Sequence, residues 1–201
     1  MVLLSLHEIK KSFKEHLVLD NINLEVKEGE CIYIHGKNGC GKSTLFKIIC
    51  DILKADHGRV EKSESAHLGA LIENPGFIEN ESIKFNLKFL SSLKNNYNEP
   101  IITKLCNDYF LDYNSYSSLK SYSVGMRQKV GIIQAVMENQ NLILFDEPTR
   151  GLDEDSIIVF ELMVNALIKE GKSVIIASHD LLSNISYSRK FLLENGKLLA
   201  E

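Results

Sequence analysis

The sequence has no tryptophan and only 3 prolines among its 201 residues, and no stretch holds the ~18 consecutive apolar residues that a membrane-spanning helix needs. Met1 to Leu6 also lacks the basic start and the long apolar segment of a signal peptide. The absence of a long apolar stretch argues against an integral membrane protein, and the absence of a signal peptide argues against a secreted one. We therefore expect any role at a membrane to depend on a partner.

Neither sign of charge dominates, because 23 Lys and Arg oppose 27 Asp and Glu for a net charge of −4. A protein that coats nucleic acid through bulk positive charge is thus excluded, and we expect no nucleic-acid partner. The apolar share of 44% and the charged share of 25% are those of an ordinary globular protein. A chain of this length buries enough surface to fold without a disulfide or a metal, and we expect a single domain over 1–201.

Cysteines are few and none form a C-x-x-C pair; they are Cys31, Cys40, Cys50 and Cys106. This pattern argues against a zinc site and a disulfide framework, and favours reduced thiols in a cytosolic protein.

Apolar runs and helical periodicities alternate along most of the chain. Strands are expected at 21–26, 31–34, 66–72, 142–145 and 173–177, with a hairpin turn at Asn195-Gly196. Helices are expected at 42–53, at 82–90 with Asn80 as its cap, at 127–133, and at 154–170. Because strands alternate with helices, we expect an α/β fold with a mostly parallel sheet, an N-terminal antiparallel β part within 2–34, and a mostly helical insert at 77–138 between 1–76 and 139–201.

A glycine-rich loop follows the expected strand at 31–34 and opens the next helix. It has the pattern G-x-x-x-x-G-K-[ST] and runs Gly36-Lys37-Asn38-Gly39-Cys40-Gly41-Lys42-Ser43-Thr44. Its backbone N–H groups and the helix N-terminus suit phosphate oxygens, while Lys42 suits the β- and γ-phosphates and Ser43 a Mg²⁺ ion. Cys40 is interpreted as a small neutral filler, with a reactive thiol as the alternative.

Two carboxylates end the apolar strand at 142–145. The carboxyl ends of parallel strands lie beside such a loop, so Asp146 is placed to hold Mg²⁺ and Glu147 to polarise an attacking water. Together, the loop and the acidic pair predict a site for phosphate groups and Mg²⁺ with a carboxylate placed to polarise water.

Three further segments complete a set whose order and spacing, along the whole chain, resemble the nucleotide-binding subunit of ATP-binding cassette (ABC) transporters. Tyr122-Ser123-Val124-Gly125-Met126 occupies the place of the family signature, usually L-S-G-G-Q, and departs from it at three positions. Gly151-Leu152-Asp153 resembles the D-loop, and Ser178-His179-Asp180 carries the switch histidine. Phe13 sits where the family has an aromatic that stacks on adenine, unless it is simply a core residue.

The resemblance implies a P-loop NTPase core and roles for individual residues. Nucleotide contacts are expected from Phe13, Gly36, Asn38, Gly39, Cys40, Gly41, Lys42, Ser43, Thr44, Glu73, Ser123, Gly125 and Asp153. Catalytic roles are expected for Lys42, Glu147 and His179, and Mg²⁺ ligands at Ser43, Glu73 and Asp146. On its own, Asp153 is also a plausible helix N-cap.

Glu73 is a departure, because the family usually has Gln there. A branch that handles lantibiotic and bacitracin-type peptide antibiotics resembles this chain in having Glu, in a context similar to Glu73-Asn74-Pro75-Gly76-Phe77. The resemblance implies an ATP-hydrolysing subunit that powers a separate membrane permease, as a homodimer or with a second cassette, on the cytoplasmic face of the membrane. Export of a peptide antibiotic, or immunity to one, is the favoured cargo.

Two other functions stay open. One is a soluble single-cassette ATPase acting on a non-membrane assembly; the other is a nucleotide sensor without hydrolysis, which intact Lys42, Glu147 and His179 disfavour.

Five of the 7 tyrosines lie between Tyr97 and Tyr122. We expect them either to mark a docking face for the permease or to pack locally.

Overall fold

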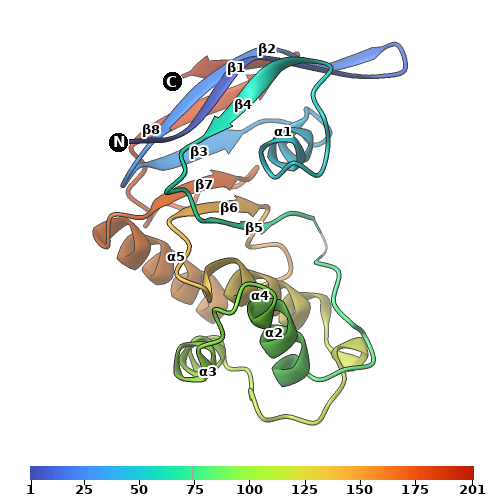
Figure 1. Cartoon of the computed structure of the whole chain (residues 1–201), viewed down its shortest axis with the longest axis vertical. Helices are drawn as coiled ribbons and strands as arrows, with labels where there is room; N and C mark the ends of the chain where they lie inside the picture. The colour runs from blue at the N-terminus through green and yellow to red at the C-terminus, as the bar shows by residue number, and fades with distance from the viewer. Residues whose placement is uncertain (74) are drawn as a thin grey trace.

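The computed structural model describes residues 1–73 and 75–201 as two β-sheets with helices on either side of the larger one (Figure 1). The strands are β1 (Val2–Phe13), β2 (His16–Lys27), β3 (Cys31–His35), β4 (His57–Lys62), β5 (Leu68–Leu71), β6 (Leu142–Asp146), β7 (Ser173–Ala177), β8 (Arg189–Glu194) and β9 (Lys197–Ala200). The helices are α1 (Lys42–Ile49), α2 (Ile83–Ser92), α3 (Glu99–Asp108), α4 (Val124–Val136) and α5 (Glu154–Lys169), with a short 3₁₀ turn at Leu119–Ser121.

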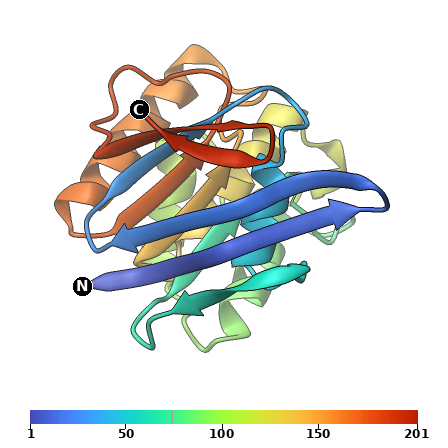
Figure 2. The same ribbon diagram turned by 90° about the horizontal axis from the view of Figure 1, so that it is seen from above.

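The smaller sheet is antiparallel and has the order β2-β1-β4. β1 and β2 form a long hairpin that runs across the middle of the view in Figure 2. This is the antiparallel part expected near the N-terminus. β4 was not anticipated, because Val60 is its one apolar residue and the strand pairs only with β1, at the edge of the sheet.

The larger sheet has the order β5-β6-β7-β3-β8-β9. All neighbouring pairs among its first five strands are parallel, and only β9 runs antiparallel to β8. β6 and β7 are buried along their entire length, as expected for central strands covered on both faces. The expected α/β fold with a mostly parallel sheet is confirmed.

Several helix boundaries differ from the expectation: α4 covers Val124–Val136 where 127–133 was expected, and two other differences have a visible cause. α1 ends at Ile49, not near 53, because the backbone N–H groups of Ile52 and Leu53 both turn back to the carbonyl of Lys47, at 2.9 and 3.1 Å, after Asp51 adopts a positive φ of 58°. Asn80 does not cap α2. Ser82 does, since its hydroxyl accepts the N–H of Phe85 at 3.2 Å.

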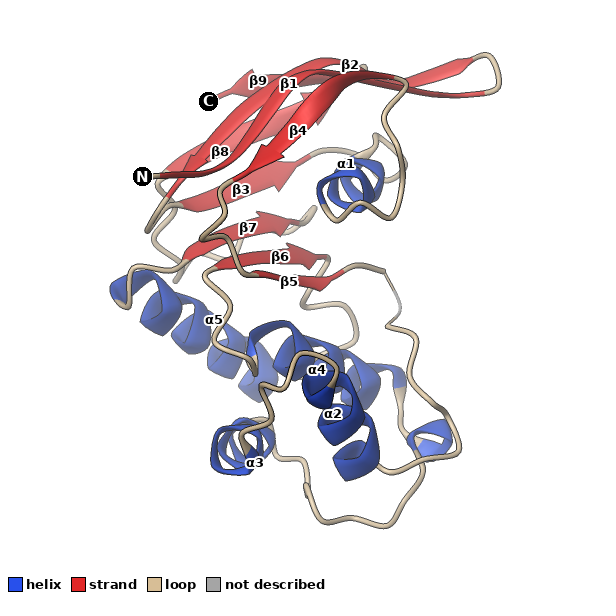
Figure 3. Cartoon of the chain, viewed as in Figure 1, coloured by secondary structure: helices blue, strands red, loops and turns tan. Residues whose placement is uncertain are grey.

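The helices divide between two hydrophobic clusters. α1 packs with both sheets, and Phe46 lies fully buried there. α2 to α5 pack together on the opposite face of the parallel sheet, as the segregation of helices and strands in Figure 3 shows. α4 contributes Val130, Ile132 and Ile133 to the cluster that also holds Phe145 of β6. The helical segment is therefore in direct contact with the strand that ends in the acidic pair.

Most of the clustered tyrosines pack locally. Tyr109, Tyr113 and Tyr122 are buried, and Tyr97 contacts Tyr113 through a hydroxyl–hydroxyl hydrogen bond of 3.0 Å. Only Tyr116 is fully exposed among the five. Of the two alternatives, burial therefore favours local packing for most of these tyrosines, because their rings fill the core of the helical segment.

Candidate active site

The glycine-rich loop joins β3 to α1 at the carboxyl edge of the parallel sheet. α1 has Gly41 as its N-cap, with a φ of 113° and no side-chain cap, so its first backbone N–H groups are left for a ligand. A Cβ at Gly36 would lie 2.3 Å from the carbonyl oxygen of Leu193, which only glycine avoids. The ammonium of Lys42 is 6% exposed and donates to the carbonyl of Gly36 at 2.8 Å. The loop thus folds around its own lysine.

Asp146 ends β6 as a buried carboxylate, 3% exposed. Its Oδ1 atom is buried and accepts no hydrogen bond. Burial raises the pKa of this carboxyl, and a hydrogen bond from the Ser43 hydroxyl opposes that rise. A buried carboxylate oxygen with no partner, beside a serine hydroxyl, is the donor set that a Mg²⁺ ion takes from a protein. The residues present therefore fit this metal.

Glu147 follows in a strained turn with a positive φ of 46°. Its Oε2 atom accepts from Nδ1 of His179 at 2.8 Å and from the Ser178 hydroxyl at 3.1 Å. Its Oε1 atom lies 3.5 Å from Nζ of Lys42. Glu147 is therefore in contact with both His179 and Lys42, although the three residues lie in distant motifs of the sequence.

A second group forms where α4 and α5 begin. Ser123 caps α4, accepting the N–H of Met126 at 3.2 Å, and Asp153 caps α5, accepting the N–H of Ser156 at 2.8 Å. Hydrogen bonds from Ser156 and then from the ammonium of Lys129 hold the pKa of Asp153 well below its usual range. Gly125 is buried in the first turn of α4. Within 1–73 and 75–201, no hydrogen bond joins Ser123 to the glycine-rich loop.

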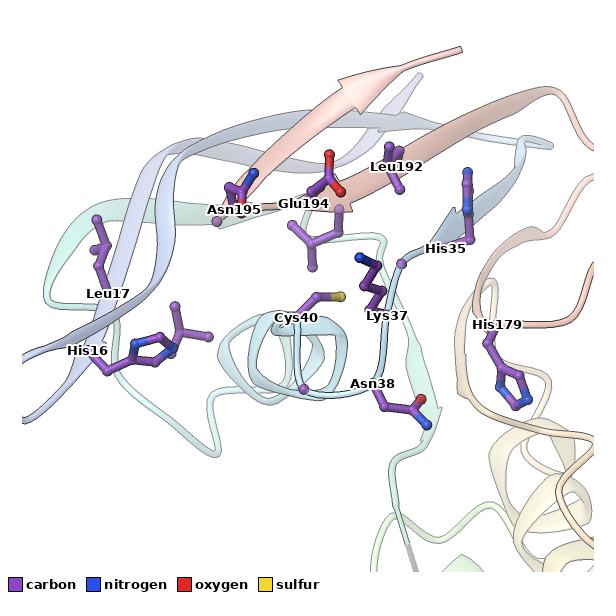
Figure 4. Close-up of a pocket in the computed structure, with 15 residues that line it drawn as sticks. His16, Leu17, His35, Lys37, Asn38, Cys40, His179, Leu192, Glu194 and Asn195 are labelled. Atoms are coloured by element: carbon purple, nitrogen blue, oxygen red, sulfur yellow. The ribbon is translucent and has the colours of Figure 1, made fainter.

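A cavity of about 740 Å³ opens between the glycine-rich loop, the β1–β2 hairpin and the β8–β9 turn (Figure 4). Asn38, Gly39 and Cys40 line it from the loop, and His179 closes one end. His16 lines it from the hairpin, although no motif in the sequence pointed to that histidine. The cavity therefore opens directly beside the glycine-rich loop that precedes α1.

Phe13 and Glu73 lie at the periphery of this arrangement. Phe13 is 46% exposed, so it is not a core residue; it pairs with His16 across the hairpin end, with Nζ of Lys11 5.6 Å from its ring centroid. Glu73 has a positive φ of 51° and directs its carboxylate to Lys47 of α1. Asn74, the next position of that motif, lies outside the described residues.

Three residues that the sequence did not single out contact the predicted ones: Gln128 and Lys129 of α4, and Lys47 of α1. None of these three belongs to a recognisable motif. In the sequence they read only as polar residues of a helix. None of the helices in the described parts of the chain is long and apolar enough to cross a membrane.

Comparison with known proteins identifies the family. The protein family described as "ABC transporter" matches residues 19–150 of this chain. The lantibiotic transport ATP-binding protein SrtF of Streptococcus pyogenes is 28% identical over 99% of this chain and 90% of its own length. The bacitracin transport ATP-binding protein BcrA of Bacillus licheniformis is 27% identical over 96% of this chain and 67% of its own length.

An uncharacterized ABC transporter ATP-binding protein, YdbJ of Bacillus subtilis, is 31% identical over 99% of this chain and 68% of its own length. The fold is also that of a solved ATP-binding subunit of an ABC transporter, with a TM-score of 0.87 at 23% identity over 98% of this chain and 88% of that one. The chain belongs to the ABC transporter family, as an ATP-binding domain that hydrolyses ATP.

Proposed function

We propose that this chain is the ATPase subunit of a transporter whose permease is a separate membrane protein. The observation that carries the proposal is the contact of Glu147 with both His179 and Lys42 at the edge of the glycine-rich loop. A carboxylate, an imidazole and an ammonium are there within reach of one another where a triphosphate would end. This is a constellation for hydrolysis, and it goes beyond what binding alone needs.

Each residue has a defined task in this proposal. The glycine-rich loop and the α1 N-terminus bind the phosphates, and Lys42 exchanges its contact with the Gly36 carbonyl for phosphate oxygens. Glu147 orients and polarises the water that attacks the γ-phosphorus in line. His179 holds the carboxylate of Glu147 in place and donates toward the developing charge.

Ser43 and Asp146 are the residues proposed to hold Mg²⁺, with Glu73 as a neighbour. When bound, the metal neutralises charge on the transferring phosphoryl group. Metal binding would also give Oδ1 of Asp146, which has no hydrogen-bond partner, a cation to coordinate. That interaction would offset the free-energy cost of burying the carboxylate.

A dimer is proposed because each chain supplies only half of each site. Ser123 and the Gly125 N–H lie at the N-terminus of α4, on a surface separate from the loop that takes the nucleotide. They would contact the phosphate held by a partner cassette, with Asp153 near the interface. One solved neighbour, a cassette bound to ADP and phosphate, is described as dimeric.

An apolar surface offers a place for the permease. A cavity of about 390 Å³ beside β5 is lined by Ile52, Ile72, Phe77 and Leu90, and α2 exposes Phe85 and Phe89 as a stacked pair with centroids 6.3 Å apart. Exposed apolar groups gathered in this way mark interaction sites. We propose that a cytoplasmic segment of the permease docks there, which holds the subunit at the inner face of the membrane.

The cargo proposed is a peptide antibiotic, exported or excluded from the cell. The support is the match to proteins described as acting in lantibiotic and bacitracin transport, together with Glu73 in place of the usual Gln.

ATP hydrolysis by the wild type and by Glu147→Gln tests the chemistry. The proposal expects the variant to bind ATP with near-normal affinity and to lose about 10²-fold or more in kcat. Equal rates would favour a nucleotide sensor. A tagged pull-down from detergent-solubilised membranes of the host tests the rest. Recovery of a polytopic membrane protein supports the transporter, and recovery of soluble proteins alone would favour an ATPase acting on a non-membrane assembly.

A further inference from the structure

One face of α4 lies on the turn that follows Glu147. Gly125, Gln128 and Lys129 are spaced three and four residues apart, so they share that face. A Cβ on Gly125 would come within 2.2 Å of the carbonyl oxygen of Gly151, so helix and turn are in direct backbone contact there. Nζ of Lys129 donates to Asp153 at 3.1 Å. α4 is thereby joined to both ends of the segment 147–153.

Gln128 makes the contact nearest to the reacting groups. Its amide Nε2 donates to the carbonyl oxygen of Glu147 at 3.0 Å and to that of Pro148 at 3.1 Å. The side chain is 6% exposed, so neither bond competes with bulk water. Both amide hydrogens are used on two consecutive carbonyls, which fixes the turn in position and in orientation.

The backbone of Glu147 needs such support. Its φ of 46° is uncommon for a residue with a side chain, and such conformations persist where the surroundings over-determine them. Its N–H is held by the carbonyl of Ala177 at 2.7 Å, from β7. Gln128 holds the other side of the same residue from a different element. The direction of the Glu147 carboxylate is therefore set jointly by β7 and α4.

We propose that Gln128 is a positioning residue for Glu147, through which α4 links its own phosphate-contacting N-terminus to the catalytic carboxylate of the same chain. Ser123 and Gln128 are separated by less than two turns of one continuous helix, so a shift at its N-terminus is transmitted to the turn. In a dimer, Ser123 serves the nucleotide of the partner. The γ-phosphate in one site would then adjust Glu147 in the other, which makes hydrolysis cooperative.

This inference rests on the proposed role of Glu147, and Gln128→Met tests it. Methionine keeps the length and volume of the side chain but removes both donors. We expect kcat to fall about 10- to 100-fold, as expected from a misplacement of about 1 Å, with KM for ATP changed less than about threefold. We expect the Hill coefficient for ATP to fall toward 1. Gln128→Leu, which also loses the donors and introduces no charge, is the second variant should methionine impair folding.

Asn86→Leu is the matched control. Asn86 of α2 is also buried, and its amide also donates to backbone carbonyls, those of Ile78 and Ser82 at 3.1 and 3.0 Å and that of Glu81 at 3.5 Å. It lies away from the catalytic turn. We expect Asn86→Leu to lower the melting temperature about as much as Gln128→Met does. Its kcat and its Hill coefficient for ATP should stay at the wild-type values. An equal fall in kcat for Asn86→Leu, or a kcat for Gln128→Met within about twofold of the wild type, would overturn the proposal.

A second measurement separates chemistry from assembly. In the Glu147→Gln background, Gln128→Met should leave ATP-dependent dimerisation on a sizing column intact, because the residue acts on the carboxylate and not on nucleotide binding. Loss of dimerisation would place Gln128 in assembly and overturn the proposal. If Glu147→Gln alone hydrolyses ATP at the wild-type rate, the proposed function fails instead.

Discussion

The ammonium Nζ of Lys47 on α1 lies 2.7 Å from Oε1 of Glu73, just beyond the end of β5. Lys47 follows Ser43 by four residues, so both side chains are on the same face of α1. The charge of Glu73 reaches the buried carboxylate beside Ser43: burial, then the charges of Glu147 and Glu73, raise the pKa of Asp146. The acid that replaces the usual Gln therefore has a cationic partner in this chain.

We expect Glu73→Gln to keep ATP binding and to change how hydrolysis is coupled to the permease. The pair is partly exposed, so its loss should change the free energy of unfolding by less than about 1 kcal/mol. The measurement is the affinity of the isolated subunit for a fluorescent ATP analogue, followed by ATPase stimulation in the assembled transporter. Unchanged transport or resistance in cells with the variant would show that Glu73 is only an exposed acid at a strand end.

Lys47→Gln is the companion change, and its effect should be larger. It leaves Glu73 as an uncompensated anion near Asp146 and a triphosphate, so we expect ATP affinity to fall by about 3- to 10-fold, or ~1 kcal/mol. Added salt should reduce the difference, because screening weakens the repulsion. A loss that is independent of salt would mean that Lys47 acts by packing and not by charge.

Gly125→Ala tests the close approach of α4 to the D-loop. The added Cβ would meet the carbonyl oxygen of Gly151 at 2.2 Å, a contact with backbone that no rotamer relieves. We expect a loss of about 1–3 kcal/mol in the free energy of unfolding and a fall in ATPase rate. Gly76→Ala is the control for stability, since nothing lies within 4 Å of its Cβ position. Equal melting temperatures for the two variants would contradict the crowded geometry.

Asp146→Asn should stabilise the nucleotide-free protein at neutral pH while abolishing hydrolysis. Because the pKa of Asp146 is raised in the folded state, its ionised form opposes folding at every pH above both its folded and its unfolded pKa. This penalty disappears as pH falls through the raised pKa toward the ordinary carboxyl value of ~4. At neutral pH the melting temperature of the variant should exceed that of the wild type by about 2–4 °C for each kcal/mol gained. In acid the two melting temperatures should be equal. A gain that persists in acid would assign the effect to something other than the carboxylate charge.

The sequence predicted the elements whose signals are local. The alternation of apolar runs located β3, β6 and β7, and the loop pattern located the start of α1. β4 was missed because its partner β1 is more than forty residues away and its own residues are mostly polar. The end of α1 was misplaced because Asp51 adopts a left-handed conformation, which aspartate does only where the chain must turn.

Motifs located the residues that we propose to contact the nucleotide, but not the residues that hold them in place. Lys42, Glu147 and His179 are recognisable because each lies in a short pattern tied to a chemistry. Gln128 and Lys47 have roles only through contacts that helix packing creates, and a polar residue on a helix is usually solvated. The tyrosines show the limit of composition: their clustering left an interface and local packing both open, and their burial within the helical segment favours local packing for most of them.

Cys40 is the thiol that should react in the folded protein. Cys31 and Cys106 are buried, and burial raises the pKa of each thiol to about 12; it raises the pKa of Cys50 to about 11. Cys40 instead lines the cavity beside the glycine-rich loop, where we propose that the nucleotide binds. We expect a maleimide near neutral pH to label Cys40 alone and to weaken ATP binding by about tenfold or more, equal to at least ~1.4 kcal/mol, because the adduct occupies that cavity.

Mass spectrometry of the labelled protein identifies the site, and ATP present during labelling should protect it. Cys40→Ala is the control: it keeps a small neutral residue in the loop, so it should bind ATP normally and stay insensitive to the reagent. An unchanged ATP affinity after complete modification would mean that the Cys40 thiol points away from the bound nucleotide and serves only to fill the loop.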